Sequence, residues 1–326
     1  LENSSVFMSL VNFTDGTYTI NKLNFLATCK NQNINIHTIQ PVFPLAIDFN
    51  FDMNTLDFNA NVNTKDLRLS SIFTTKGILN KNVSKAIKNT KLSINANASF
   101  NSEEKSFIYN SDGEMKIPSY FINDGAVLKY NLTGDGEHLD LQKMTVSGKS
   151  CDIDLSLDFF YKDLQLSGFA NINDFTMKNS NKLSTELYFE PFEKGFAIFS
   201  PQIYIGEQIF TALEVNILPQ EDSMDFVFEI SDYTNVFGDQ TTINDPGNIY
   251  LDGSYIFGTN YIQTGITFTN FYLYSILNTV KQLLPLDKAN NFMSVINFSK
   301  PYVLAGEGYF STDFNSISYN LPYFVF

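Results

Sequence analysis

The sequence has little of what most catalytic sites require. Its 326 residues include no Trp, a single Arg (Arg68), two His and two Cys. With histidine only at His37 and His138, a zinc site or a His-dependent catalytic triad is close to excluded. Neither a Gly-x-Ser-x-Gly elbow nor a phosphate-binding P-loop occurs. We therefore predict that the protein is not an enzyme, and that it has no catalytic residue, no metal site and no cofactor.

Positive charge is also scarce. The chain has 21 Lys and Arg against 35 Asp and Glu, for a net charge of −14. A protein that binds a nucleic-acid duplex needs clustered cations to displace counterions, and no such cluster occurs. An anionic membrane surface is an equally poor electrostatic partner. Nucleic acid is therefore not an expected partner.

Long apolar runs are absent too. No segment approaches the ~20 apolar residues that a membrane-spanning helix needs, and no signal peptide is visible. Because the sequence begins within a strand pattern at Leu1, we expect a fragment of a longer chain, with the targeting segment upstream. Cys29 and Cys151 are far apart and could pair in an oxidising compartment, but two cysteines do not make a disulfide framework.

What the chain does contain is strict alternation of apolar and polar residues. In the stretch 42–54, Phe43, Leu45, Ile47, Phe49, Phe51 and Met53 occupy every second position, and most residues between them are Asp or Asn. Side chains of a strand alternate between its faces, so this stretch predicts a strand with one apolar and one polar face. Similar stripes recur along most of the chain, about every ten residues, which is typical of an all-β fold with antiparallel neighbours.

Turn signals separate the expected strands. They lie at Asp112-Gly113, Asp124-Gly125, Gly134-Asp135-Gly136 and Pro246-Gly247. Strands are expected at 17–20 and 23–28, among other places. Acidic residues Asp152, Asp154 and Asp158 fall on the polar side of one strand, so we interpret them as a solvated face and not as a catalytic pair.

Helical spacing occurs in a few places. Ser275–Leu284 has apolar residues at helical intervals and is closed by Pro285, a second helical segment can follow from Asp287 to 297, and 82–89 is a weaker candidate. Each plain helix would pack on the core. The excursions also suggest coarse repeats near 66–170, 171–270 and 271–326 within a single elongated β-sheet region, 1–326.

The main question is what covers such a long one-sided apolar sheet. A second sheet can pack on it in a sandwich, the sheet can close into a barrel, or it can curl into an open trough lined by apolar side chains. The large number of strands, the similar Phe-rich stripes and the monotonous polar positions favour the trough. We therefore expect an all-β fold built on a long curled antiparallel sheet, an open trough with one or two short helical excursions.

Three segments carry a resemblance to a known family. Leu164–Ile172 and Ile249–Tyr255 contain the form apolar-x-apolar-x-Gly-x-apolar, and Val303–Phe310 is similar to it. This pattern resembles the strand units of TamB/AsmA-type bacterial envelope proteins, over nearly the whole chain but through degenerate motifs. The resemblance implies a sheet folded lengthwise like a taco shell, located in the periplasm and spanning from the inner to the outer membrane of a diderm bacterium.

The function that the resemblance implies is bridge-like lipid transport and outer-membrane biogenesis. Phospholipid would be the cargo, an outer-membrane barrel assembly protein the partner, and the inner membrane would be reached through an N-terminal anchor missing from this sequence. Acyl chains would lie in a hydrophobic groove, shielded from water by the hydrophobic effect. The groove would be lined by Leu45, Ile47, Phe49, Phe51, Met53, Leu92, Ile94, Ile153, Leu155, Leu157, Phe159, Phe226, Phe228, Ile230, Leu251 and Tyr255.

Two other functions stay open at this point. The alternating aromatic residues of Tyr319–Phe326 resemble the last strand of an outer-membrane β-barrel, although Pro322 favours an edge strand. A secreted β-sandwich adhesin or carbohydrate-binding module is the third possibility.

Overall fold

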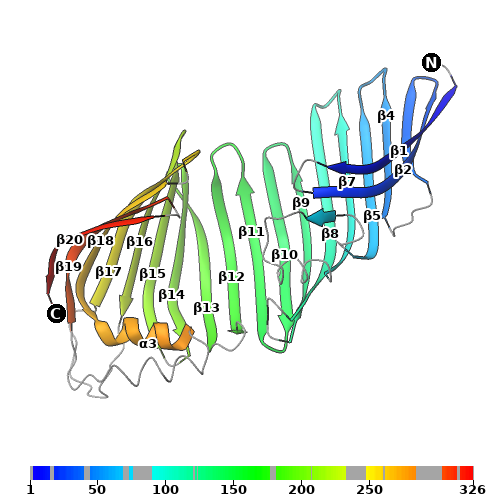
Figure 1. Cartoon of the computed structure of the whole chain (residues 1–326). Helices are drawn as coiled ribbons and strands as arrows, with labels where there is room; N and C mark the ends of the chain where they lie inside the picture. The colour runs from blue at the N-terminus through cyan, green and yellow to red at the C-terminus, as the bar shows by residue number, and fades with distance from the viewer. Residues whose placement is uncertain are drawn as a thin grey trace. The chain divides into compact units, whose positions relative to one another are not determined.

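The computed structural model describes residues 3–14, 18–39, 45–68, 73–75, 90–119, 122, 124–176, 181–206, 208–232, 247–259, 261–283, 303–313 and 316–325. These residues are almost entirely β-strand, with one α-helix among them (Figure 1). The strands form an antiparallel sheet that is not closed. The expected fold class, all-β with a curled open antiparallel sheet, is confirmed.

The chain divides into two compact units, Leu1–Ser156 and Leu157–Phe326. In unit 1, each strand pairs with the next along the chain, except that β5 pairs with β7 and the short β6 pairs with the start of β2. The strands are β1 (Ser4–Thr14), β2 (Tyr18–Lys30), β3 (Asn33–Thr38), β4 (Leu45–Asp52), β5 (Phe58–Arg68), β6 (Phe73–Thr75), β7 (Lys91–Asn101), β8 (Ser106–Ile117), β9 (Ala126–Asp135) and β10 (His138–Gly148). Strand β11 (Cys151–Phe160) contains the boundary between the units.

Unit 2 repeats this meander. Its strands are β12 (Gln165–Thr176), β13 (Lys182–Phe192), β14 (Gly195–Ile205), β15 (Gln208–Pro219), β16 (Ser223–Asp232), β17 (Gly247–Ile256), β18 (Tyr261–Tyr272), β19 (Val303–Thr312) and β20 (Ile317–Val325), each paired with the next. Helix α3 (Leu273–Leu283) follows β18 and packs against β14, β15 and β18. It is the helix expected at Ser275–Leu284, whereas the segments 82–89 and 287–297 lie outside the described residues.

One β-bulge recurs near the ends of three strands. The pairing register shifts between Thr64 and Leu67 in β5, between Ile172 and Phe175 in β12, and between Phe268 and Phe271 in β18. Each bulge contains a non-glycine residue with positive φ, namely Asp66 at 50°, Asp174 at 52° and Asn270 at 49°. Such bulges bend the strand and increase its local twist. The strands that pair beside β5, β12 and β18 after these bulges are β7, β13 and β19.

The spacing of these bulges follows the expected repeat starts. Residues 66 and 174 lie at or beside the expected starts of the first two repeats, and 270 directly precedes the third, at 271. The division into units at Ser156 follows a different boundary. The repeat limits 66–170, 171–270 and 271–326 therefore stay a prediction, while the shared bulge is a structural observation.

Two local expectations were wrong. Residues 18–20 and 23–28, expected as separate strands, belong to one strand, β2, whose first residues pair with β6 and whose later residues pair with β3, while residue 17 lies outside the described residues. Asp112-Gly113 is not a turn but lies within β8. The ring of Tyr130 on β9 covers Gly113, with its Cε1 2.6 Å from where a Cβ would stand, so the missing side chain is replaced by a cross-strand aromatic ring.

Candidate functional site

The apolar stripes of the sequence lie on the strands as expected, and none of the residues assigned to the groove is fully buried. The alternation is clearest in β4, where Leu45, Ile47, Phe49 and Phe51 are half-buried and the first three residues between them are exposed. The same half-burial applies to the other residues assigned to the groove, with the exception of Met53. These are Leu92, Ile94, Ile153, Leu155, Leu157, Phe159, Phe226, Phe228, Ile230, Leu251 and Tyr255.

Met53 differs from the rest of the set. It lies after the end of β4, in the turn before β5, and is 37% exposed. Its backbone N–H donates to the carbonyl of Gln32 at 2.9 Å, so the chain has already left the strand alternation there. Met53 therefore sits at the edge of the apolar face and does not continue the β4 stripe.

In unit 1 the register brings these stripes into rows across the sheet. Phe51 pairs opposite Phe58, Phe58 opposite Phe100, and Phe100 opposite Phe107, so four phenylalanines from β4, β5, β7 and β8 form one row. The rings of Phe58 and Phe100 are stacked with centroids 5.9 Å apart. Rings at such distances add favourable contacts to the apolar area that they bury. This row lines one margin of the apolar face of unit 1.

Beside the phenylalanine row, the apolar face of unit 1 is lined by small residues. Ala60 pairs opposite Ala98, and Val62 opposite Ala96. Ile36 on β3 and Tyr109 on β8 flank this area, since they occupy the same row as Ala60 and Ala98. This part of the apolar face therefore presents small side chains between larger ones.

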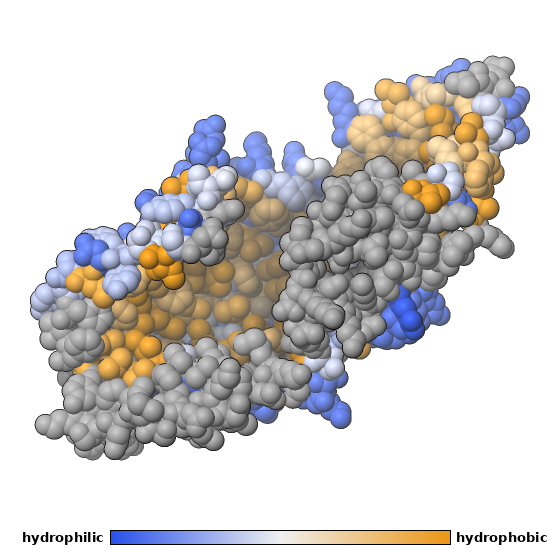
Figure 2. Space-filling view, viewed as in Figure 1, coloured by the Kyte–Doolittle hydropathy of each residue, from blue (hydrophilic) through white to orange (hydrophobic). Residues whose placement is uncertain are grey.

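Unit 2 presents the same kind of face. The register aligns Val215, Phe228, Leu251 and Ile266 in one row across β15 to β18. The neighbouring row runs through Ile217, Phe226, Gly253 and Thr264, and the ring of Phe226 lies over Gly253, with its Cζ 2.8 Å from where a Cβ would stand. Figure 2 shows apolar side chains gathered on a hollowed face of this unit.

Among the described residues of unit 2, the largest fully buried side chain lies beside helix α3. Phe271 is fully buried and stacks on Phe210 with ring centroids 6.3 Å apart, and Leu304 is 3% exposed. Within this core, Asn278 of α3 donates from Nδ2 to Oε1 of Gln208 at 3.1 Å. The helix therefore covers one end of the strands, where full burial is reached. The stripes farther along the strands remain half-exposed.

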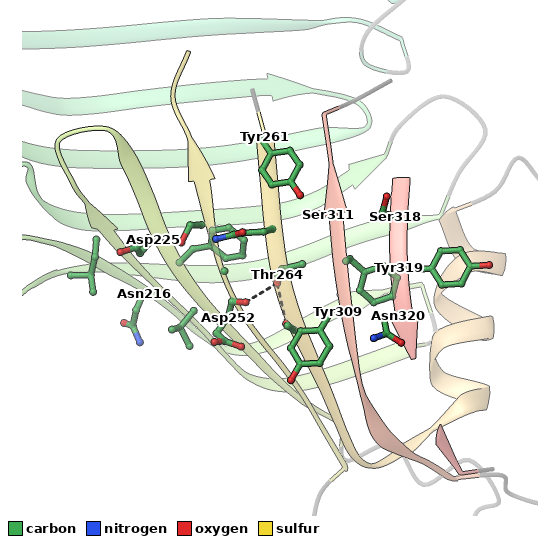
Figure 3. Close-up of a pocket in the computed structure, with 18 residues that line it drawn as sticks. Asn216, Asp225, Asp252, Tyr261, Thr264, Tyr309, Ser311, Ser318, Tyr319 and Asn320 are labelled. Carbon is green, nitrogen blue, oxygen red and sulfur yellow. Dashed lines mark hydrogen bonds between the residues drawn. The ribbon is translucent and has the colours of Figure 1, made fainter. Parts of the chain in front are cut away.

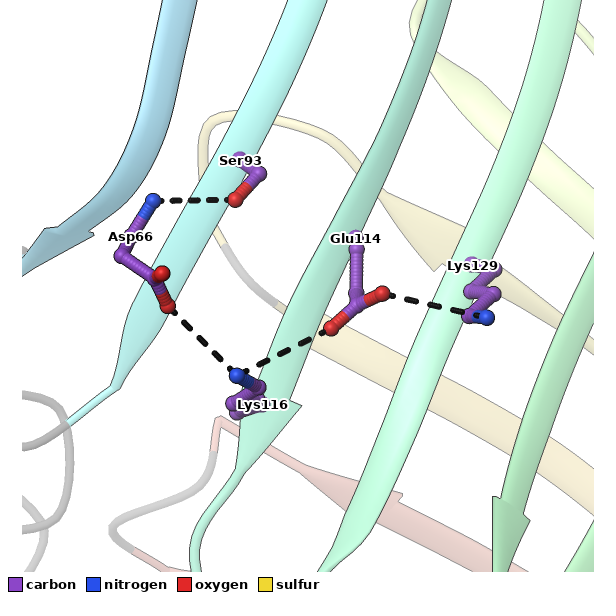
Figure 4. Close-up of polar contacts among 5 residues, drawn as sticks. All are labelled: Asp66, Ser93, Glu114, Lys116 and Lys129. Carbon is purple, nitrogen blue, oxygen red and sulfur yellow. Dashed lines mark hydrogen bonds and ion pairs between the residues drawn. The ribbon is translucent and has the colours of Figure 1, made fainter.

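The opposite face of the sheet is polar. In unit 1, Asn61, Asn97 and Asn110 form a row across β5, β7 and β8, and Asn97 donates to Oδ1 of Asn110 at 3.0 Å. At the β5 bulge the Asp66 N–H donates to Ser93 Oγ at 3.0 Å, and its carboxylate lies 3.5 Å from Lys116 Nζ (Figure 4). Glu114 joins Lys116 to Lys129 in the same figure through contacts of 4.0 and 3.8 Å. This face is exposed to water, and so are its ion pairs. Exposed ion pairs contribute little to stability.

Three titratable groups have shifted pKa values, and each shift has a local cause. The backbone N–H of Ser102 lowers the pKa of Asp57, with further help from the hydroxyls of Thr55 and Ser102. The hydrogen bond to Glu186 raises the pKa of Tyr188. Burial raises the pKa of the Cys151 thiol, and the charge of Asp152 adds to the effect. The three groups lie apart in the sequence and do not form a reactive cluster with one another.

The two cysteines are free thiols. Cys151 is buried, whereas Cys29 is half-buried on β2, opposite Ile34 of β3, and so belongs to the apolar face of unit 1. In the described part of the chain, no group of three or more His, Cys, Asp or Glu side chains is placed to hold a metal ion. None of the described helices is long and apolar enough to cross a membrane.

Sequence reasoning missed two features of the site. The Gln208–Asn278 pair that fixes α3 could have been sought as an Asn on the apolar side of the expected helix. The bulges at Asp66, Asp174 and Asn270 have no clear sequence signal apart from an Asp or Asn before a large apolar residue, because a bulge depends on the partner strand.

Together these features define an open antiparallel sheet with one apolar and one polar face in each unit. No family model, no curated protein and no solved structure matches the chain.

Proposed function

We propose that the protein is a non-enzymatic conduit for phospholipid, in which the apolar faces of the sheet shield acyl chains while head groups stay in water. The observation that carries the proposal is the half-burial of the apolar stripes. Fifteen residues assigned to the groove are half-buried and none of them belongs to the sealed core. Apolar surface of this extent costs free energy in water, at about 25 cal/mol per Å², unless a ligand covers it.

Acyl chains suit this surface better than a protein partner. The face of unit 1 is lined by side chains such as Phe49, Val62, Ala96 and Ile94, which carry neither charge nor hydrogen-bonding groups. A protein partner is usually fixed by hydrogen bonds as well as by apolar contact. An acyl chain needs only apolar contact, at about 0.8 kcal/mol for each buried CH₂ group. The opposite face of the sheet is polar and suits contact with water. The proposed cargo would therefore lie on the apolar face only.

The cellular role is proposed by resemblance to TamB/AsmA-type envelope proteins. By that resemblance, the chain would lie in the periplasm of a diderm bacterium and carry phospholipid between the inner and outer membranes. Its partner would be an outer-membrane barrel assembly protein. The inner membrane would be reached through an anchor upstream of this sequence. These assignments rest on the strand pattern in Leu164–Ile172, Ile249–Tyr255 and Val303–Phe310.

The test is direct extraction of bound lipid. The protein is expressed in a Gram-negative host, purified without detergent, extracted with organic solvent and analysed by mass spectrometry. We expect phospholipid in at least an equimolar amount, retained through size-exclusion chromatography. A folded, lipid-free protein that also fails to take up a fluorescent phospholipid from vesicles would contradict the proposal.

A further inference from the structure

A groove in unit 2 is lined mainly by residues of the polar face, and Phe226 is the one residue assigned to the lipid path that also lines it. The groove runs over strands β15 to β20 and has a volume of about 730 Å³ (Figure 3). Pockets that bind small molecules typically measure about 300–1,000 Å³. Most of its lining side chains, such as Asp225, Asp252 and Tyr309, alternate along their strands with residues of the apolar face. These side chains therefore lie on the side of the sheet that faces away from the apolar stripes.

The charge of the groove restricts its ligand. Its lining residues include Asp225 and Asp252 but neither Lys, Arg nor His. Two carboxylates without a compensating cation repel phosphate, sulfate and carboxylate groups, and the chain as a whole carries a net charge of −14. The two carboxylates do not belong to a group of three or more metal-ligating side chains in the described residues. A neutral ligand fits this lining better than an anion or a metal ion.

The hydrogen-bonding groups of the groove are dense and regularly spaced. The register aligns Asp225, Ser254, Gln263, Ser311 and Ser318 in one polar row across β16 to β20. Within this row, Ser254 Oγ donates to Asp225 Oδ1 at 2.6 Å, which orients the carboxylate. Closely spaced carboxylate, amide and hydroxyl groups match a ligand with several adjacent hydroxyl groups, each of which both donates and accepts.

A buried acceptor adds to this set. Asn216 lines the groove and its Nδ2 donates to Glu214 Oε1 at 3.0 Å, which fixes the amide. Within the described part of the chain, its Oδ1 is buried without a hydrogen-bond partner. A buried polar atom of this kind costs about 1–3 kcal/mol when it stays unpaired. A hydroxyl donor that reaches the floor of the groove would recover that cost.

The second row of the groove contains an aromatic platform. Asp252, Gly265, Tyr309 and Asn320 are consecutive cross-strand neighbours on β17 to β20. Because Gly265 has no side chain, the Asp252 carboxylate lies over it, with Oδ1 2.9 Å from where a Cβ would stand. Tyr309, the next residue in the row, is 57% exposed. A ligand that lies over this row can hydrogen-bond to Asp252 and Asn320 while its C–H groups lie on the negative face of the Tyr309 ring.

We infer that this groove binds carbohydrate, a neutral polyhydroxylated ligand, through hydrogen bonds to Asp252 and Asn320 and stacking on Tyr309. The inference is independent of lipid transport, because the residues that it uses, Asp252, Asn320 and Tyr309, lie on the face opposite the apolar stripes. Failure of one proposal therefore leaves the other untouched.

The experiment is saturation-transfer NMR and calorimetry on the purified chain with three probes: maltotriose, cellotriose and tri-N-acetylchitotriose. We expect saturable binding of at least one trisaccharide. Tyr309→Leu and Asp252→Asn should each weaken that binding at least tenfold, because they remove the platform and the charged acceptor. Tyr250→Leu is the matched control, since Tyr250 lies on the same polar face, is 37% exposed and does not line the groove.

Circular dichroism checks that each variant keeps its strand spectrum, and both groove substitutions are made at exposed positions so that folding is retained. The inference is overturned if none of the three trisaccharides binds at millimolar concentration. It is also overturned if binding persists unchanged in Tyr309→Leu and Asp252→Asn, or if Tyr250→Leu weakens it as much as Tyr309→Leu does.

Discussion

The two cysteine thiols have different environments, which the sequence alone does not reveal. Cys151 is 1% exposed, and burial raises its pKa, so little reactive thiolate forms near neutral pH. Cys29 is half-buried on the apolar face of unit 1. We expect a water-soluble maleimide to label Cys29 in the native protein at least tenfold faster than Cys151, and both at similar rates in guanidinium chloride. Mass spectrometry of labelled peptides measures the two rates, and equal native rates would contradict the burial of Cys151.

Asp57 predicts an effect of pH on stability. It accepts a hydrogen bond of 2.7 Å from the Ser102 N–H, which joins the turn after β4 to the turn after β7 and lowers its pKa. A lowered pKa in the folded state stabilises the protein above the ordinary carboxyl pKa of about 3.9, and the contribution is lost as pH falls through the folded value.

The test is the variant Asp57→Asn, studied by urea unfolding. We expect it to be less stable than the natural sequence at pH 7, with the difference shrinking as pH falls below about 4. Glu103→Gln, in the turn after β7, serves as a control for the loss of one exposed carboxylate. If the stability difference between Asp57→Asn and the natural sequence stays constant from pH 7 to pH 3, the charge of the Asp57 carboxylate does not contribute to stability.

At the scale of single elements, the recurring bulge is the feature that mutation tests most directly. Asp174 has a φ of 52°, its N–H donates to Ser184 Oγ at 3.1 Å, and its carboxylate lies 3.0 Å from Lys182 Nζ. Asp66 likewise donates its N–H to a serine of the neighbouring strand, Ser93, but its carboxylate pairs with Lys116 of β8, one strand farther away. A positive-φ Asp whose N–H donates to a serine of the neighbouring strand thus occurs at both bulges.

We expect Asp174→Val to destabilise unit 2 by about 1–3 kcal/mol, because a β-branched residue is strained at positive φ. Asp174→Gly should cost less, since glycine accepts this conformation, and Lys182→Ala should change stability by roughly 0–1 kcal/mol because the ion pair is exposed. Chemical denaturation measures all three. If Lys182→Ala costs as much as Asp174→Val, the ion pair and not the backbone holds the bulge.

Helix α3 offers a second prediction at this scale. Gln208 and Asn278 are buried and hydrogen-bonded to each other, so removing one leaves the other without this partner. We expect Gln208→Leu or Asn278→Leu alone to cost about 1–3 kcal/mol, and the double substitution to cost less than the sum of the two. A double-mutant cycle measured by thermal unfolding gives the coupling. Additive effects would show that the pair does not act as a unit.

The same elements show how far the sequence predicts the structure. The period-two pattern of residues such as Leu45 to Phe51 was enough for the strands, and the apolar spacing with Pro285 was enough for helix α3. The pattern could not distinguish Asp112-Gly113 within a strand from a turn, because the deciding contact comes from Tyr130 on another strand. Bulges and the polar groove were not predicted for the same reason, since both depend on pairing register.

For the whole molecule, the central claim is that the apolar faces are open and not the halves of a sealed core. In a dry core an unpaired carboxylate costs several kcal/mol and unfolds the domain. On a half-buried face it reaches water at a much smaller cost, but it interrupts the apolar surface that an acyl chain would follow.

The most direct measurement is the phospholipid content of three variants, Phe49→Asp, Leu155→Asp and Phe228→Asp, purified without detergent. Their matched controls place the same carboxylate on the adjacent residue of the opposite face: Asn50→Asp, Ser156→Asp and Val227→Asp. The account predicts that all six proteins keep the strand spectrum, and that the first three carry several-fold less phospholipid than the natural sequence while the controls carry the same amount. Loss of the strand spectrum in the first three alone, or unchanged lipid in all six, would contradict it.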